Sequence, residues 1–460
     1  MMDRRTMVKS LAAAGLAAAG LAAGGLAAAS TGTAQTRQNP APLKPPRLQP
    51  GMTVALVAPA GSSNNRQQVL HGIDVLKSLG YRVKEGKNLY RRTQYLAGTD
   101  EERADDVNEA FADPDVDAIF TLTGGYGTMR ILPHLDYETI RANPKVVIGY
   151  SDITGLLLGL YARAGLVGFH GPVASSTFSE YTLSEYKKVV VNPSQSVEIG
   201  TPPRVDYPEG QAERSNRLMT FAGGKARGRL IGGNLSLISP LVGTPYLPDF
   251  DGAILFLEDV HEAFYRLDRM ITHLLLAGKL EQVSGIVMGK FTKIPEEGNS
   301  FNLEEIIEQL LVPLGVPVLR GLMIGHVLDK TTVPMGIMAE LDADAEAGVG
   351  LEADAGVPAR CAAETLADDL AAGATRVRTV AALAGRAALA LAAGPKSTAG
   401  TTAAPPKAGR RHRGRGRGGP VRVDDDDRVL GLARGDGALE VLAGRSCHVA
   451  GTARRKLGRA

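Results

Sequence analysis

The sequence predicts an α/β protein of two domains, in which a first domain built on a parallel sheet is followed by a second α/β domain. Short apolar segments alternate with helical patterns, which is typical of a parallel sheet covered by helices on both faces. A second series of strands and helices begins near residue 226, and the 460-residue length exceeds what one ordinary core requires. We therefore expect the first domain at residues 51–178 and the second at residues 226–357.

The first domain begins with a short apolar strand, and a helix follows because apolar residues recur along one helical face before a glycine. In order, the expected elements are a strand at 52–61, a helix with Val69, Ile73, Leu76 and Leu79 on one face that ends at Gly80, a strand at 81–85, a helix at 100–111, strands at 117–122 and 145–149, and a helix at 153–164. Ligands of parallel sheets bind beyond the carboxyl ends of the strands. We therefore expect the Gly-rich turn at 123–127 and Ser151 at the same edge of the sheet.

The second domain is preceded by residues 179–225, which are rich in Ser, Pro and charge and which we interpret as a linker and an irregular segment. After it, apolar strands and a helical pattern recur, so a second sheet with its own core is expected. The expected elements are GRLIGGNLSLISPLVGT at 228–244, the strand AILFLED at 253–259, a helix at 266–276, the strand GIVMGKF at 285–291 and PVLRGLMIGH at 317–326.

The two ends of the chain differ from the domains. Residues 1–34 carry Arg4 and Arg5 before a long Ala/Leu/Gly stretch, which is the layout of a twin-arginine export signal. We expect a periplasmic protein with no stable membrane insertion after cleavage, the alternative being an uncleaved anchor. Residues 35–50 are predicted to be a Pro-rich linker. Residues 358–460 are low in complexity and offer little apolar surface, so we expect a disordered tail; a shifted reading frame would also explain the abrupt change.

Composition excludes several kinds of site from the two domains. The formal net charge is +3, and the clustered positive charge lies mostly at 410–422 in the tail, so the rest of the chain gives no reason to expect a nucleic-acid partner. Electrostatic binding of nucleic acid by the tail itself is the alternative. Both cysteines, Cys361 and Cys447, also lie in the tail. Cysteine nucleophiles and zinc–thiolate sites are therefore excluded from the domains.

The stretch VVIGYSDITG at 146–155 joins an apolar strand to an apolar helix through Ser151. A serine at such a turn either caps the helix, by accepting a hydrogen bond from a first-turn N–H, or is exposed as a nucleophile. In the second interpretation the backbone N–H of Asp152 points to where an oxyanion would form. The match to G-x-S-x-G is partial, because Ile153 occupies the position of the second glycine.

A serine nucleophile needs a base and a carboxylate that orients the base. The two domains contain six histidines, namely His71, His134, His170, His261, His273 and His326. His326 follows an apolar strand, at a position where loops carry function. His71 and His273 fall in helical stretches and His134 and His170 in turns, where packing or a structural hydrogen bond is the simplest role. Glu258 also ends an apolar strand, so it and His326 could reach a shared cleft.

Four long motifs follow one another along the chain: GGYGTMRILPHLDY, NPKVVIGYSDITGLLLGLYARAGLVGFHGP, GGNLSLISPLVGTPYLPDFDGAILFLEDVHEAFYRLDRMITHL, and GLMIGH with TTVPMG. Together they resemble the LD-carboxypeptidase family of serine peptidases, peptidase family S66. This family includes murein tetrapeptide carboxypeptidases and the microcin C self-immunity peptidases. The resemblance extends from about residue 46 to about residue 357. It implies a metal-free peptidase of two α/β domains with the catalytic cleft between them, and a homodimer.

The resemblance also implies a catalytic triad of Ser151, Glu258 and His326. In this triad Ser151 attacks the peptide carbonyl, His326 acts as base and then as acid, and Glu258 holds the imidazolium. The turn TGGYG lies beside the elbow, so the N–H groups of Gly125 and Asp152 are the candidate oxyanion hole. The turn lacks the G-x-G-x-x-G spacing of a dinucleotide-binding loop. Family members release C-terminal D-alanine from the L-configured centre of the stem-peptide diamino acid, which implies a murein tetrapeptide or muropeptide substrate.

Two further residues are candidates for substrate binding. A carboxypeptidase must bind a free carboxylate, for which a bidentate arginine such as Arg130 is suited, although Arg130 could instead pair with Asp136. Asn234 in GGNL either lines the cleft or stabilises a turn.

Two departures from the family and two rival functions bear on the interpretation. An export signal suggests periplasmic muropeptides or the sacculus as substrate, rather than murein recycled in the cytoplasm. The tail has no counterpart in the family. One rival is a related immunity-type amidase or peptidase that acts on modified peptide-nucleotides. The other is a catalytically silent muropeptide-binding protein.

Overall fold

The computed structural model describes residues 39–352, except for residues 64, 194–195 and 296–297. The predicted export signal at 1–34 and the predicted tail at 358–460 lie outside the described residues and stay predictions. Within the described ranges, no helix has the length and apolarity needed to cross a bilayer.

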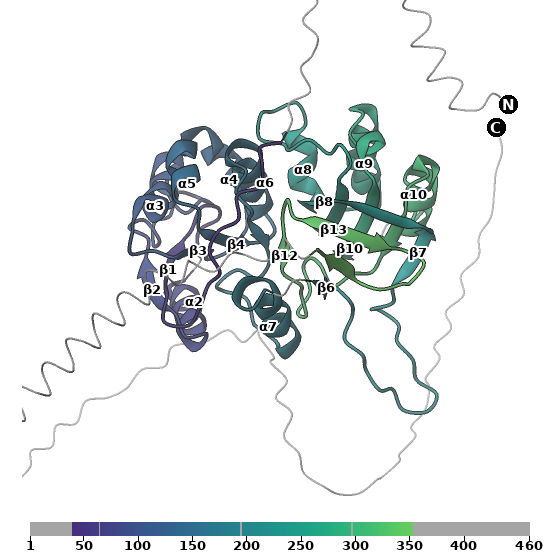
Figure 1. Cartoon of the computed structure of the whole chain (residues 1–460), viewed down its shortest axis with the longest axis horizontal. Coiled ribbons are helices and arrows are strands. Elements are labelled where there is room, and N and C mark those ends of the chain that lie inside the picture. Colours follow the sequence, from purple (N-terminus) through teal and green to yellow (C-terminus); the bar gives the residue numbers. More distant parts are fainter. Residues whose placement is uncertain (1–38, 64, 194–195, 296–297, 353–460) are drawn as a thin grey trace, which may run out of the picture. The chain divides into compact units, whose positions relative to one another are not determined.

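The first sheet has six strands in the order β12-β5-β4-β3-β1-β2 (Figure 1). Its strands are β1 (Thr53–Val57), β2 (Arg82–Glu85), β3 (Ala118–Thr121), β4 (Val146–Gly149), β5 (Phe169–His170) and β12 (Val333–Pro334). The first five are parallel, and β12 pairs antiparallel with β5. Nearly every residue of β1, β3 and β4 is buried, as expected for strands covered on both faces.

The helices of this first half are short to medium in length. They are α2 (Arg66–Ser78), α3 (Asp100–Ala112), α4 (Thr128–Ile131), α5 (Tyr137–Ala142), α6 (Ile153–Ala164) and α7 (Glu180–Tyr186), with helical turns η1 (Leu132–His134) and η2 (Lys187–Val191). Helix α3 begins at a capping box, in which Thr99 and Glu102 each bond the other's backbone N–H. Helix α3 packs on β1 and β3, and α6 packs on β4 and β5.

The second sheet has eight strands in the order β6-β14-β13-β8-β9-β10-β11-β7. Its strands are β6 (Val197–Ile199), β7 (Met219–Ala222), β8 (Lys225–Asn234), β9 (Ile254–Val260), β10 (Gly285–Thr292), β11 (Val318–Arg320), β13 (Met338–Asp342) and β14 (Val349–Leu351). The helical elements between them are α8 (Leu235–Leu241), α9 (Phe264–Leu276), α10 (Leu303–Leu310), η3 (Leu280–Gln282) and η4 (Val312–Leu314). Strands β8, β9, β10 and β11 are parallel and carry the core, whereas the outer strands pair antiparallel.

The predicted α/β class with a parallel first sheet is confirmed, and the expected helix at 153–164 has the observed bounds of α6. Residues 179–225 are more regular than their composition indicates, because they supply α7 and two strands, β6 and β7, that pair at the two edges of the second sheet. Strand β12 comes from the later part of the chain yet joins the first sheet. Edge strands and two-residue strands carry little apolar pattern, so periodicity does not reveal them.

The expected element at 317–326 is a strand only in its first part, and His326 does not follow that strand directly. Strand β11 ends at Arg320, and residues 321–326 form a loop that carries His326. Gly321 at the start of this loop has φ +110°, and a Cβ there would lie 2.1 Å from the backbone oxygen of Arg217. The strand therefore ends at a glycine that turns away from the sheet.

Helix α6 is buried on almost all sides, because ten of its twelve residues are buried. It contacts β4 and β5 of the first sheet and also α8 and β8 of the second half. At this contact the Thr154 hydroxyl accepts a hydrogen bond from the Asn234 backbone N–H at 3.1 Å. A Cβ on Gly233 would lie 2.5 Å from Cγ2 of Thr154. A glycine at this position therefore lets β8 lie directly against the helix that follows Ser151.

Replacing Gly233 with alanine tests this close approach. Gly233→Ala adds a clash with Thr154 to the cost of an alanine at φ +136°, so we expect the free energy of unfolding to fall by about 2–4 kcal/mol. Gly243→Ala is the matched control, because Gly243 also has positive φ, +83°, but a Cβ added there would have no atom within 4 Å. We expect the control to lose about 1 kcal/mol in chemical denaturation. Equal losses in the two variants would contradict the packing argument.

Candidate active site

Ser151 lies at a strained turn between β4 and α6. Its φ is +65°, a left-handed conformation that costs a non-glycine residue on the order of 1–3 kcal/mol. Gly149, two residues earlier, has no room for a side chain, because a Cβ would lie 2.3 Å from Oγ1 of Thr121 and 2.8 Å from Cγ2 of Ile153. No side-chain capping bond is formed at the start of α6 by its N-cap residue Asp152. The geometry is that of a nucleophile elbow, in which backbone strain exposes the serine.

The Gly-rich turn that follows β3 packs directly against this elbow. A Cβ on Gly124 would lie 2.9 Å from Cβ and 3.1 Å from Oγ of Ser151. Gly125 has φ +112° and lies against Gly61, whose N–H donates to the oxygen of Gly124 at 3.1 Å. In the described part of the chain, no protein group accepts a hydrogen bond from the backbone N–H of Gly125 or of Asp152. Gly125 lines the cavity that contains Ser151, whereas Asp152 is 2% exposed and is not among the lining residues, so the oxyanion hole stays a prediction.

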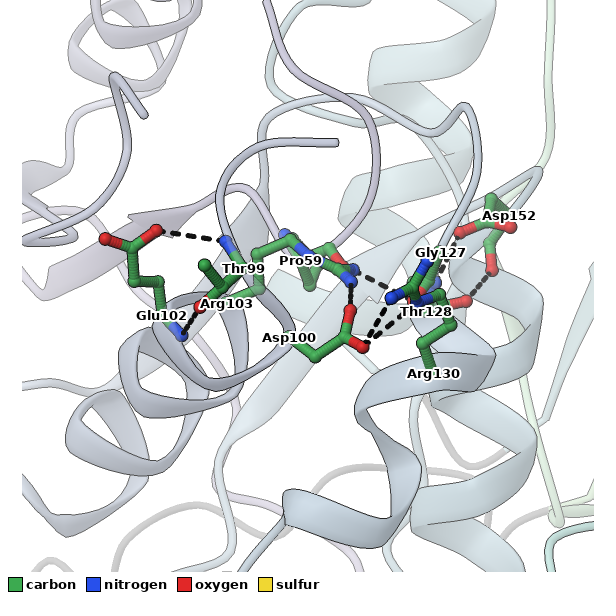
Figure 2. A network of polar contacts seen from close by, with 9 residues as sticks. All are labelled: Pro59, Thr99, Asp100, Glu102, Arg103, Gly127, Thr128, Arg130 and Asp152. Atoms are coloured by element: carbon green, nitrogen blue, oxygen red, sulfur yellow. Dashed lines mark hydrogen bonds and ion pairs between the residues drawn. The ribbon is translucent and has the colours of Figure 1, made fainter. Parts of the chain in front are cut away.

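A buried arginine holds this turn in place. Figure 2 shows Arg103 reaching from α3 to the backbone oxygens of Pro59 and Gly127, and to the Asp100 carboxylate. The Arg103 side chain is fully buried, and burial lowers its pKa while Asp100 opposes that shift. Because Pro59 follows β1 and Gly127 ends the Gly-rich turn, one guanidinium joins the ends of two neighbouring strands.

Asp152 ties the same turn to the elbow. Its Oδ2 accepts the backbone N–H of Thr128 at 2.8 Å, and the Thr128 hydroxyl donates to its backbone oxygen (Figure 2). Burial raises the pKa of Asp152, and the hydrogen bonds from Thr128 oppose that rise. The residue after Ser151 therefore fixes the start of α4 and, through it, the position of the Gly-rich turn.

The second half supplies a carboxylate and an imidazole that bond to each other. Glu258 on β9 is completely buried, and its Oε2 lies 2.7 Å from Nδ1 of His326. Gly325 makes this possible, because a Cβ there would lie 2.8 Å from the same Oε2. Burial raises the pKa of Glu258, but two nearby histidines, His170 and His326, outweigh it, so the pKa is held well below its usual value. Glu258 therefore stays ionised and keeps Nδ1 of His326 protonated.

His170 is the second histidine beside this carboxylate. It lies at the end of β5, next to β4, and is 1% exposed. Its Nε2 lies 3.5 Å from Oε1 of Glu258, which is longer than a normal hydrogen bond. Glu258 thus lies between two imidazoles, one from each half of the chain.

Ser151 and His326 line one cavity of about 380 Å³. Tyr150, which directly precedes Ser151, lies next to His326, because the centres of the two rings are 4.9 Å apart. Two larger hollows, of about 830 Å³ each, lie near Tyr207 and near Tyr265, and neither is lined by a histidine. A strained serine, an imidazole oriented by a buried carboxylate and free backbone N–H groups together suit acyl transfer through a serine nucleophile.

The two candidate substrate-binding residues lie outside the lining of this cavity. Arg130 on α4 is about half exposed, and its Nε and Nη2 bond Oδ2 of Asp100 at 3.0 and 2.8 Å (Figure 2). Asn234 is buried at the end of β8, where its Nδ2 donates to Oδ1 of Asp259 at 3.1 Å. The alternative partner Asp136 instead caps α5. Substrate contact by Arg130 and Asn234 stays a prediction.

Sequence reasoning misses His170 and Lys330. The sequence pattern suggests a turn and a structural role for His170, but it ends the strand next to β4, and its position after the apolar run LVGF is the signal that indicates this. Lys330 lines the cavity together with Ser151. It lies four positions after His326 in sequence, yet no local pattern distinguishes it from a surface lysine.

A metal site is not evident in the residues that the structure describes, since no group of three or more His, Cys, Asp or Glu side chains could hold an ion there.

Comparison with known families accounts for both halves of the molecule. The model of the LD-carboxypeptidase N-terminal domain matches residues 54–171, and that of the LD-carboxypeptidase C-terminal domain matches residues 227–341. The chain belongs to the LD-carboxypeptidase family, peptidase family S66. The family inferred from the sequence motifs is thereby confirmed, and the protein is a peptidase of the hydrolase class.

Similar proteins include some named as murein peptide carboxypeptidases and some named as microcin self-immunity proteins. The probable murein peptide carboxypeptidase of Bacillus subtilis is 37% identical over 306 residues, which cover 65% of this chain and 91% of that protein. A solved structure of muramoyltetrapeptide carboxypeptidase from Oxalobacter formigenes has a TM-score of 0.56 and 32% identity, over 65% of this chain and 99% of that chain. The microcin C7 self-immunity protein MccF of Escherichia coli is 31% identical over 297 residues, covering 61% of this chain and 86% of that protein. MccF in complex with glutamyl sulfamoyl guanosine has a TM-score of 0.62 and 28% identity, over 68% of this chain and 98% of that chain.

Removing the guanidinium of Arg103 should destabilise the protein and loosen its Gly-rich turn. Arg103→Met leaves the oxygen of Pro59 without its donor and leaves the oxygen of Gly127 with only the backbone N–H of Arg130, so we expect a loss of about 3 kcal/mol in the free energy of unfolding and a lower peptidase kcat. The control is Arg91→Met, because Arg91 is 65% exposed and forms only a surface ion pair with Glu102. Denaturant titration should place the control within about 0.5 kcal/mol of the wild type. If Arg103→Met were equally stable, the turn would not depend on Arg103.

Proposed function

We propose that this protein is a serine LD-carboxypeptidase that hydrolyses the bond between the L-configured centre of a diamino acid and the C-terminal D-alanine of murein tetrapeptides, in cell-wall turnover or recycling. The observation that carries the proposal is a strained Ser151 in one cavity with His326, whose Nδ1 lies 2.7 Å from the buried Glu258. Relatives named as murein peptide and muramoyltetrapeptide carboxypeptidases support the substrate class.

Each catalytic residue has a defined step in this proposal. Ser151 Oγ attacks the scissile carbonyl carbon while Nε2 of His326 takes the proton of the Ser151 hydroxyl. The oxyanion that forms accepts hydrogen bonds from the N–H groups of Gly125 and Asp152. His326 then gives the proton to the amine of D-alanine, which leaves as the C–N bond breaks. Water hydrolyses the acyl-enzyme by the same route and returns the proton to Ser151. Glu258 holds the imidazolium in both steps and stays ionised.

The predicted export signal would determine the compartment in which the enzyme encounters its substrate. If residues 1–34 direct export by the twin-arginine route, the enzyme acts on periplasmic muropeptides or on the sacculus. This part of the proposal depends on sequence alone.

A second candidate function is cleavage of an aminoacyl-sulfamoyl nucleotide. It is favoured by the TM-score of 0.62 to MccF bound to glutamyl sulfamoyl guanosine. The same triad would serve, because both reactions transfer an acyl group to serine. Turnover of aminoacyl-sulfamoyl nucleotides with none of murein tetrapeptide would favour this second candidate.

Substitution of the nucleophile tests the serine mechanism. Ser151→Ala should abolish release of D-alanine from murein tetrapeptide, with kcat reduced on the order of 10⁴-fold or more. Mass spectrometry of the muropeptide products measures this directly. Ser78→Ala, at an exposed serine on α2, is the matched control and should keep wild-type activity. Unchanged D-alanine release by Ser151→Ala would exclude Ser151 as the nucleophile.

Neutralising the triad carboxylate tests the role of Glu258. Glu258→Gln keeps the shape of the side chain but removes the negative charge that stabilises the His326 imidazolium, so we expect kcat to fall about 10³- to 10⁴-fold. The measurement is kcat for D-alanine release together with thermal unfolding, which should show a folded variant. Glu262→Gln is the control, because Glu262 is paired with the exposed Arg266 and does not line the cavity. A Glu258→Gln enzyme with near wild-type kcat would remove Glu258 from the mechanism.

A further inference from the structure

We propose that Lys330 binds the C-terminal carboxylate of the peptide substrate. This inference deepens the proposed function and rests on it, because only a carboxypeptidase requires a free carboxylate next to the scissile bond. The inference depends on the position of Lys330, on the contacts of its ammonium, and on whether another lysine or arginine lines the cavity.

Lys330 lies in the wall of the catalytic cavity. It lines the 380 Å³ cavity together with Ser151 and His326. Its backbone is fixed, since its N–H donates to Oγ1 of Thr182 at 3.0 Å, and the residue as a whole is 6% exposed. Its Nζ lies 5.2 Å from the centre of the Tyr150 ring, and the same ring lies 4.9 Å from that of His326. The ammonium is therefore held close to the proposed catalytic base.

The Lys330 ammonium has no anionic partner in the described part of the chain. Its neighbour Asp329 instead accepts a hydrogen bond from the Ser179 hydroxyl at 2.6 Å. Burial lowers the pKa of Lys330, while the more distant charges of Asp329 and Glu258 oppose that shift. A nearly buried cation without a counter-charge is costly, and a bound carboxylate would remove that cost.

Other buried cations differ from Lys330 because protein groups already satisfy them. The Arg103 guanidinium bonds Asp100 and two backbone oxygens. The Nζ of Lys290 donates to the oxygen of Ser215 at 3.2 Å and to Oδ1 of Asn216 at 3.1 Å. Lys330 is therefore a cation held in place and left open to the cavity.

The chemistry of a C-terminal substrate requires a cation at such a position. Only the nitrogen and Cα of the last residue separate the scissile carbonyl carbon from the terminal carboxylate, so its oxygens lie within roughly 5 Å of that carbon. Among the described residues that line the cavity, Lys330 is the single lysine or arginine, and none is a carboxylate. Arg130, the cation expected from sequence, is bonded to Asp100 and does not line the cavity.

Lys330 could alternatively act only by supporting Tyr150 through a cation–π contact. A supporting role would affect every substrate equally. A carboxylate-binding role affects only substrates with a free C-terminus. This difference separates a substrate-binding residue from a structural one.

Peptide binding to an inactive enzyme is the first experiment. In the Ser151→Ala background, calorimetry compares the tetrapeptide ending in D-alanine with the same peptide ending in D-alaninamide. We expect the acid to bind on the order of 100-fold more tightly than the amide, and expect Lys330→Gln to reduce this preference to a few-fold by weakening only the acid. Lys330→Arg should retain part of the preference. Lys290→Gln is the matched control, since it neutralises another partly buried lysine outside the cavity, and it should leave the preference unchanged.

Turnover is the second experiment. In the enzyme that retains Ser151, kcat/KM for D-alanine release should fall on the order of 100-fold in Lys330→Gln, while kcat/KM for the amide substrate stays within a few-fold of the wild type. The same variants and substrates are used. Arg130→Gln is added, because Arg130 is the other cation that could bind the substrate carboxylate.

Three results would overturn the assignment of Lys330. They are binding without preference for the acid, equal losses on acid and amide in Lys330→Gln, and a preference that depends on Arg130 instead. The proposed function fails separately: an enzyme that binds the acid in a Lys330-dependent manner but releases no D-alanine would support the carboxylate site and exclude the carboxypeptidase reaction.

Discussion

The buried carboxylate of Glu258 is the constraint on which the rest of the site depends. An ionised carboxylate with no solvent exposure is stable only if positive charge or hydrogen-bond donors surround it. One imidazole comes from β5 of the first sheet and the other from the loop after β11 in the second. The Glu258 carboxylate therefore lies where the two halves of the described chain meet, hydrogen-bonded to His326 of its own half and next to His170 of the other. The same contact brings His326 into the cavity that contains Ser151. The loop that gives Glu258 its hydrogen bond from His326 therefore also forms part of the wall of the cavity.

Glycine permits the close approaches from which the site is built. Gly124 lies against Ser151, and Gly325 lies against Glu258, so each of these two side chains has a glycine where a Cβ would intrude. Gly233 has the same role between β8 and α6. The chain contains 55 glycines, and these three show that part of that content serves packing rather than flexibility. Ser151 itself is not a glycine, so its positive φ costs energy. The hydrogen bond from the Thr128 N–H to the neighbouring Asp152 helps to hold Ser151 in this conformation.

The features that sequence predicts well here are those encoded within about ten residues. Helix α6 and strands β1, β4 and β9 are predictable because their apolar patterns are local, and Ser151 and Glu258 stand out because they lie near the ends of β4 and β9. His326 lies in the loop after β11, and the family resemblance is what assigns it to the triad. What depends on distant partners is not predictable in this way. Pairing of β5 with β12 joins Phe169–His170 to Val333–Pro334, and only this arrangement makes His170 a neighbour of Glu258. The partner of Arg130 is Asp100, thirty residues away, rather than the nearer Asp136. Lys330 looks like an ordinary surface lysine until the fold buries it.

Under the proposed mechanism the cavity must stabilise two negative charges, the terminal carboxylate of the substrate and the oxyanion of the transition state. The two charges differ in when they exist, so they are best stabilised by different groups. The substrate carboxylate is charged before and after reaction, so a full cation such as Lys330 can hold it throughout. The oxyanion exists only near the transition state, and backbone N–H groups favour it most because they are already oriented and are not attracted as strongly to the neutral carbonyl. A lysine beside the carbonyl oxygen would instead compete for the carboxylate and bind the substrate in an unproductive register. Under the proposed mechanism, backbone dipoles from the first half and the Lys330 ammonium from the second would together fix how a peptide C-terminus is oriented in the cavity.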